Sequence, residues 1–323
     1  MCPPIPRRAL LAAAVLAGAT RAQAQDFPAR SLRIVVGFPP GTAADIAARI
    51  VSPGMATRLG QPIVIENRPG AGSSIGAAEV ARAAPDGYSI ALGTVANTIN
   101  VSYQRDLSFD FARDFAPVAP LVTVPNILVV HPSVQATSVQ DLIALARRQP
   151  GVLFYGSSGL GTSPHLSGDM LAMMAGIEMT HVPYAGSAQA VTDLLAGRVN
   201  LLFSPAATVL QHIATGRLRA LASTGAVRTA AAPDLPTMIE SGLAGFESAV
   251  WAGLLVPAAT PRPIIARLSA AAVEARDSPD IRRQLLAQGF DILEGGPDAL
   301  AQLIASETAK WARVVQASGA RSN

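Results

Sequence analysis

The chain has 323 residues, half of them hydrophobic, with 25 Lys and Arg residues, 22 Asp and Glu residues and one cysteine. This length suits two domains of ordinary size. The positive mean hydropathy excludes an intrinsically disordered chain, which combines low hydrophobicity with high net charge.

The first 24 residues have the pattern of a secretory signal peptide. Arg7 and Arg8 precede an apolar run over 9–19, and Ala22-Gln23-Ala24 has the form of a cleavage site. The run is too short to cross a bilayer, which needs about 20 residues. The sequence therefore predicts a periplasmic protein cleaved after Ala24, and leaves the general and the twin-arginine export routes open.

Cleavage changes the charge balance and the cysteine count. It removes three arginines and no acid, which leaves 22 basic against 22 acidic residues. A neutral chain without a clustered basic face predicts no nucleic-acid partner. The only cysteine, Cys2, leaves with the signal, which excludes disulfides and thiol catalysis in the mature chain.

From residue 31 onward, short apolar runs alternate with helix-length segments, which predicts an α/β fold with mostly parallel strands. We expect strands at 32–36, 63–65, 88–92, 127–130, 152–155, 179–182, 199–203 and 218–223. We expect helices near 46–59, 75–84, 138–148, 165–175, 188–196 and 207–215, and three more after Pro261, near Pro279 and after Pro297. Two apolar crossings, near 121–130 and 248–256, predict two lobes, 25–124 plus 249–323 and 125–248.

The loop over 37–45 carries the strongest local signal for a binding site. It follows the first strand, contains Pro39-Pro40-Gly41, and opens a helix whose first N–H groups lack intrahelical acceptors. Such a helix end binds a carboxylate or a phosphate without a cationic side chain. The alternative is a proline-stiffened turn in which Asp45 is only a first-turn acid.

Three further loops precede predicted helices. The segment 181–188 repeats the strand–proline–glycine–helix order and could face the first loop across a cleft, while 155–163 supplies hydroxyl groups. In 70–76 we expect a glycine turn in which Ser73 and Ser74 cap the next helix. Its glycine spacing and the lack of a ribose-binding acid argue against a dinucleotide site.

The alternative of an exported enzyme finds little support. A hydrolase would use Ser158 or Ser163 with His165, but no G-x-S-x-G motif and no positioned acid accompany them. The four histidines lack zinc-type spacing. We therefore expect no catalytic activity, no cofactor and no metal.

Taken together, the loops resemble those of the Bug (TctC-type) family, the extracytoplasmic solute receptors of tripartite tricarboxylate transporters. The resemblance spans almost the whole mature chain. It rests on segments including 32–41 (LRIVVGFPPG), 66–72 (ENRPGAG), 84–88 (APDGY), 161–166 (GTSPHL), 181–184 (HVPY), 233–237 (PDLPT) and 251–254 (WAGL).

The resemblance implies a type II periplasmic-binding-protein fold with a two-strand hinge and a cleft that closes on the ligand. It implies that main-chain N–H groups and ordered waters hold a small organic carboxylate. The ligand-binding residues carried over are Phe38, Pro40, Gly41, Thr42, Asp45, Ser157, Gly161, Thr162, His165, Tyr184, Gly186, Ser187 and Ser204. The implied partners of a monomeric receptor are the inner-membrane transporter subunits or, with the same site, a sensor protein.

Two positions depart from the family pattern. Thr42 replaces the second of two glycines, so its methyl narrows the loop and its hydroxyl offers a further hydrogen bond. Ser204 stands where the family often has an aspartate that would recognise an amino group. The sequence therefore favours an organic acid without an amine.

Overall fold

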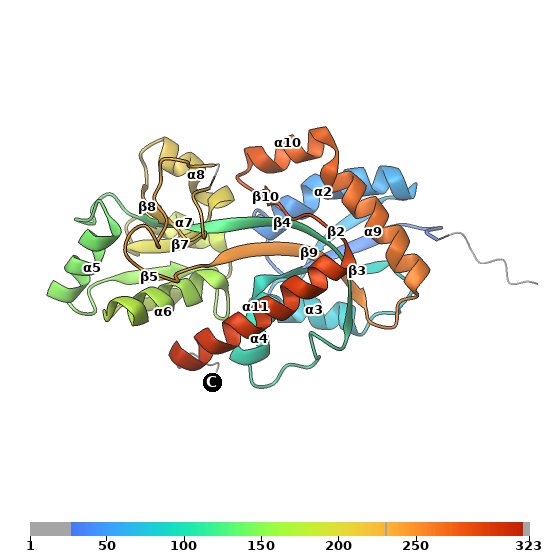
Figure 1. Cartoon of the computed structure of the whole chain (residues 1–323), viewed down its shortest axis with the longest axis horizontal. Helices are drawn as coiled ribbons and strands as arrows, with labels where there is room; N and C mark the ends of the chain where they lie inside the picture. The colour runs from blue at the N-terminus through green and yellow to red at the C-terminus, as the bar shows by residue number, and fades with distance from the viewer. Residues whose placement is uncertain (1–26, 230, 319–323) are drawn as a thin grey trace, which may run out of the picture.

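The computed structural model describes residues 27–229 and 231–318 (Figure 1). The predicted signal peptide lies outside the described residues. In the described ranges, no helix has the length and apolar character needed to cross a membrane. The predicted α/β fold with two lobes is confirmed, and the lobes lie at the two ends of a pair of long strands.

The first lobe is built on three parallel strands in the order β2–β1–β3. They are β1 (Leu32–Val36), β2 (Ile63–Asn67) and β3 (Ser89–Thr94). The helical elements of this lobe are α2 (Ala43–Leu59), the 3-10 turn η1 (Ala71–Ser73), α3 (Ser74–Ala81), α4 (Val95–Tyr103), α9 (Arg262–Asp277), α10 (Pro279–Ala287) and α11 (Pro297–Ser318). Helix α11 packs against α4, β4 and α6, so it contacts both lobes.

The second lobe repeats the parallel arrangement in the order β7–β5–β6. Its strands are β5 (Phe154–Ser157), β6 (Thr180–Pro183), β7 (Leu201–Pro205) and β8 (Arg219–Ser223). Its helices are α5 (Val139–Arg148), α6 (Ser163–Ala175), α7 (Ser187–Leu195) and α8 (Ala206–Ala214). These bounds confirm the helices expected from 138 to 215 to within two residues at each end.

Two antiparallel strands connect the lobes, β4 (Phe115–Val130) and β9 (Ala249–Pro257), and they run side by side through the centre of Figure 1. β4 pairs with β9 up to Pro125 and with β7 from Asn126 onward. The expected mostly parallel sheet is therefore parallel only within each lobe, because β4, β8, β9 and the short β10 (Asp291–Ile292) pair antiparallel. The residue limits of the lobes stay a prediction.

Two local expectations are wrong. The sequence analysis places no helix between residues 92 and 127, where the structure has α4. Ser73 does precede α3, but its backbone is left-handed, with φ 77°, and its side chain makes no capping hydrogen bond. The Ser74 hydroxyl accepts a hydrogen bond from Asn100 Nδ2 at 3.2 Å, so it holds the 70–73 loop against α4.

Candidate functional site

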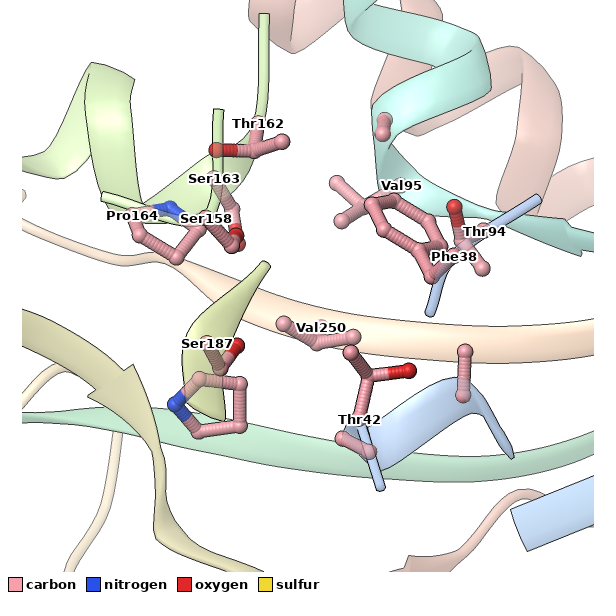
Figure 2. Close-up of a pocket in the computed structure, with 14 residues that line it drawn as sticks. Phe38, Thr42, Thr94, Val95, Ser158, Thr162, Ser163, Pro164, Ser187 and Val250 are labelled. Carbon is pink, nitrogen blue, oxygen red and sulfur yellow. The ribbon is translucent and has the colours of Figure 1, made fainter. Parts of the chain in front are cut away.

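A pocket lies between the lobes, at the point where five helices begin (Figure 2). Helices α2 and α4 reach it from the first lobe, and α6, α7 and α8 reach it from the second. Its lining consists of Phe38, Thr42, Ala43, Ala44, Thr94, Val95, Ala96, Ser158, Thr162, Ser163, Pro164, Ser187, Pro205 and Val250.

The start of α2 presents backbone donors to this pocket. Thr42 is the N-cap residue, and Ala43 and Ala44 are the first two residues of the helix. No residue in the described ranges accepts a hydrogen bond from the N–H groups of these three residues, whereas the N–H of Ile46 already bonds the Thr42 carbonyl. Unpaired N–H groups at the positive end of a helix dipole favour an anion.

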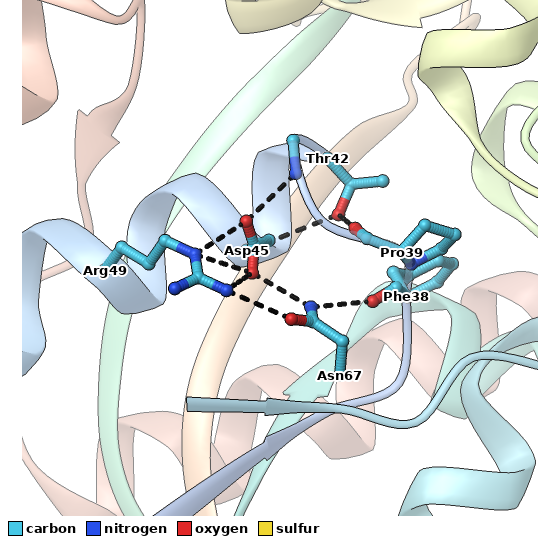
Figure 3. Close-up of polar contacts among 7 residues, drawn as sticks. Phe38, Pro39, Thr42, Asp45, Arg49 and Asn67 are labelled. Carbon is cyan, nitrogen blue, oxygen red and sulfur yellow. Dashed lines mark hydrogen bonds and ion pairs between the residues drawn. The ribbon is translucent and has the colours of Figure 1, made fainter. Parts of the chain in front are cut away.

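Asp45 lies outside the pocket lining and supports the 38–42 loop through hydrogen bonds (Figure 3). Its carboxylate accepts hydrogen bonds from Gly41 N at 2.9 Å, from Asn67 Nδ2 at 2.9 Å and from Arg49 Nε at 2.9 Å. Asn67 Nδ2 also donates to the Phe38 carbonyl at 2.9 Å. Asp45 is therefore a positioning residue in this structure and does not line the pocket.

The charge of Asp45 is stabilised in this setting. Burial alone would raise the pKa of the carboxyl, but the hydrogen bonds from Arg49, the Gly41 N–H and Asn67 lower the pKa below its ordinary value. The carboxylate stays ionised at neutral pH, with its charge directed at Arg49 and away from the pocket.

The second lobe contributes hydroxyl groups. Ser158, Ser163 and Ser187 line the pocket, and Figure 2 shows these serines around its second-lobe side. The threonine hydroxyls at two N-caps are committed to the chain itself, since Thr42 donates to the Pro39 carbonyl at 2.9 Å and Thr162 to the Gly159 carbonyl. At position 42 the backbone N–H is therefore the donor left for the pocket.

No charged side chain is among the described residues that line the pocket. Phe38, Val95, Pro164, Pro205 and Val250 form apolar walls between the donor groups. The arrangement combines apolar walls with polar groups at helix ends. Chemically it can bind and orient an anion, because charge-assisted hydrogen bonds strengthen where water is excluded.

A buried polar cluster lies behind the second-lobe wall. His165 and His181 stack with their ring centroids 4.1 Å apart, and His181 Nε2 lies 2.7 Å from Ser157 Oγ. His165 Nδ1 accepts from the Gly161 N–H at 3.3 Å, and His165 Nε2 is 3.4 Å from Asp169. Burial lowers the pKa of each histidine to about 4, so both rings are neutral at pH 7.

The structure separates the predicted site residues into those that line the pocket and those around it. Four of them line the pocket, namely Phe38, Thr42, Thr162 and Ser187. A wider cleft adjoins the pocket, and its lining includes Phe38 and Tyr184. Pro40 and Gly41 lie on the exposed side of their loop, and Gly186 precedes α7 against Pro39. Outside the pocket lining are Asp45, Ser157, Gly161, His165 and Ser204, whose hydroxyl pairs with Thr208 at 2.7 Å.

Several pocket residues were missed by the sequence analysis. Thr94, Val95 and Ala96 come from the start of α4, Pro205 caps α8, and Val250 lies on the crossing strand β9. A strand that ends in Thr94 with Asn97 three residues later could have indicated a helix start, because the two residues form a capping box. For Val250 the sequence holds no comparable signal.

Two lobes on a pair of crossing strands, with a pocket between them lined by helix N-termini, define a solute-binding protein. The family model described as "Tripartite tricarboxylate transporter family receptor" (TctC) matches residues 47–320. The chain belongs to this family of periplasmic receptors. Protein BugT of Bordetella pertussis is 34% identical over 300 residues, which cover 92% of each chain.

Other relatives also align with this chain over almost its full length. A UPF0065 protein from the tcbD-tcbE intergenic region of Pseudomonas sp. strain P51 is 40% identical over 316 residues, or 96% of this chain and 94% of that protein. The solved structure of Rpa4515 of R. palustris with adipate has a TM-score of 0.88 and 36% identity, covering 91% of this chain and 99% of that one. MatC of Rhodopseudomonas palustris with bound malate has a TM-score of 0.85 and 32% identity, covering 90% and 100%.

Proposed function

We propose that the protein captures a small organic carboxylate between the N-termini of α2 and α7 and delivers it to the membrane subunits of a tripartite transporter. The observation that supports this proposal most strongly is the composition of the pocket. It sets the unpaired N–H groups of Thr42, Ala43 and Ala44 opposite Ser163 and Ser187, without a charged side chain in its lining. The bound adipate and malate of two similar receptors support a carboxylate ligand.

The donor groups are sufficient in number for useful affinity. A hydrogen bond to a charged acceptor contributes roughly 1.5–3 kcal/mol. Three or four such bonds, after the cost of ordering ligand and loops, reach the approximately 8 kcal/mol of a micromolar site. Binding of this kind needs no general acid, base or nucleophile, and we propose a receptor without catalytic activity.

The ligand we propose carries no amino group. A buried ammonium group needs a carboxylate or several carbonyl acceptors. The position that the sequence analysis associates with an aspartate holds Ser204, whose hydroxyl is paired with Thr208. Two acids close in sequence to lining residues, Asp45 and Asp169, are engaged with Arg49 and Tyr155.

The test is calorimetry on residues 25–323 with matched acid pairs. We expect micromolar binding of adipate or malate, and at least tenfold weaker binding of 2-aminoadipate and aspartate. A thermal-shift screen of mono-, di- and tricarboxylates identifies the preferred chain length. The proposal is wrong if no carboxylate in the screen raises the melting temperature or releases heat on binding.

A further inference from the structure

A chain of buried polar side chains connects the pocket to the two crossing strands. Asn126 lies on β4, Ser248 immediately precedes β9, and Ser163 is the first residue of α6 and lines the pocket. The exposed fractions of these three residues are 0%, 0% and 1%. Ser167 and Thr224, both fully buried, extend the same network.

Asn126 sits at the centre of the network. Its Nδ2 donates to Ser163 Oγ at 3.2 Å and to Ser248 Oγ at 3.2 Å. Its backbone is fixed by Thr224, whose N–H donates to the Asn126 carbonyl at 2.9 Å. Asn126 is also the residue at which β4 changes partner from β9 to β7. The amide therefore has one orientation relative to both lobes.

The amide determines where the Ser163 hydroxyl directs its proton. A hydroxyl that accepts a hydrogen bond from an amide N–H has its own proton free to point elsewhere. Among the described residues, none accepts a hydrogen bond from Ser163 Oγ. Because Ser163 borders the pocket, that proton is available to a ligand oxygen there (Figure 2).

The oxygen atom of the same amide group carries an energetic cost. Asn126 Oδ1 is buried and has no hydrogen-bond partner in the part of the chain that the structure describes. An unpaired buried acceptor destabilises the fold. An apolar side chain at this position would avoid that cost, but it would also remove the hydrogen bonds to Ser163 and Ser248.

We infer that Asn126 is a positioning residue for ligand binding, which aims the Ser163 hydroxyl proton at the carboxylate. This rests on the proposed function, since Ser163 acts as a donor only if an anion occupies the pocket. The inference adds a residue outside the pocket lining to the determinants of affinity. It also ties one ligand donor to the strand that joins the lobes.

A double-mutant cycle with adipate and malate as the probes tests the inference by calorimetry. We expect Ser163→Ala to weaken binding by about tenfold, the loss of one hydrogen bond to a charged acceptor. Asn126→Ala should weaken binding by about three- to tenfold, because the hydroxyl is then free to rotate. The double variant should bind no more weakly than Ser163→Ala alone, since both changes remove the same interaction.

Ser248→Ala is the matched control. It removes the second acceptor of the same amide and leaves the Asn126–Ser163 bond in place, so its Kd should stay within about twofold of the wild type. If Asn126 acted only by stiffening the hinge, Ser248→Ala would weaken binding as much as Asn126→Ala. Asn126→Asp, which can only accept from Ser163 when ionised, should weaken binding at least as much as Asn126→Ala.

The outcomes separate this inference from the proposed function. A wild-type protein that binds neither probe overturns both. Wild-type binding combined with an unchanged Kd for Asn126→Ala, or with losses that multiply in the double variant, overturns the inference alone. Should the Asn126 variants fail to fold, a crystal structure of the wild-type adipate or malate complex decides, since a Ser163 Oγ without a ligand oxygen within hydrogen-bond distance contradicts it.

Discussion

Pro39 and Gly186 meet across the cleft, so closely that a side chain on Gly186 would crowd the proline ring. A Cβ at Gly186 would lie 3.1 Å from Pro39 Cγ. The φ of Gly186 is 178°, an extended conformation that any residue adopts. The glycine is therefore favoured by the close approach of the two loops rather than by its own backbone.

We expect Gly186→Val to weaken ligand binding by about tenfold or more, because the added side chain holds the 38–42 loop away from the start of α7. The melting temperature without ligand should change little. Ala188→Val, an exposed position in the first turn of the same helix, is the control. Equal affinities of the two variants by calorimetry would show that the Pro39–Gly186 contact does not limit closure.

A second prediction removes one backbone donor without removing the helix. Ala43 is the first residue of α2, where proline fits well because that N–H has no helical acceptor. Ala43→Pro should therefore keep the fold and weaken carboxylate binding by about tenfold or more. Ala43→Gly removes the methyl group but retains the N–H, so calorimetry should find near-normal affinity. Similar losses in both variants would mean that the loss of affinity does not come from the missing N–H.

A third prediction concerns the support of the 38–42 loop. Asn67→Ala removes the side-chain donor to the Phe38 carbonyl and one of the donors to Asp45, so we expect a loss of about 1–3 kcal/mol in unfolding free energy and weaker binding. Arg49→Met removes a half-exposed partner of Asp45 and should cost at most about 1 kcal/mol. Urea denaturation measures the unfolding free energy of both variants. A loss for Arg49→Met as large as the loss for Asn67→Ala would contradict the prediction.

The fourth prediction concerns pH. The unfolded chain takes up protons on its histidines near pH 6.5, whereas burial holds the pKa of His165 and of His181 at about 4. Stability is therefore full above pH 6.5 and falls as the pH drops towards 4, by roughly 2–5 kcal/mol for the pair. His181→Gln should flatten this dependence in urea titrations between pH 4.5 and 7, while His212→Gln, outside the cluster, should not. A stability that rises on acidification would contradict this reading.

The positions of the two main loops could be predicted from the sequence because each combines a strand end, a proline and a helix start. Those signals are local, and Thr42 and Ser187, which they single out, both line the pocket. The role of Asn67 depends on contacts with Phe38 and Asp45, which lie 29 and 22 residues away. No spacing rule within the second strand indicates such a contact.

The start of α4 was missed for a different reason. Helix α4 follows β3 directly, without an intervening loop, and its capping box uses Asn97 instead of glutamate or glutamine. At Ser73 the sequence predicted a capping side chain that the structure does not have. A serine before a helix favours capping, but the left-handed backbone of Ala71 and Ser73 turns that side chain out of capping geometry.

The central claim is that backbone N–H groups at the start of α2 hold the ligand carboxylate. Amide NMR spectra of the ¹⁵N-labelled protein, recorded during titration with adipate or malate, test it most directly. The account predicts that the amide protons of Thr42, Ala43 and Ala44 move strongly downfield as they bond to a charged oxygen. Saturable binding that leaves these three signals unmoved would contradict it.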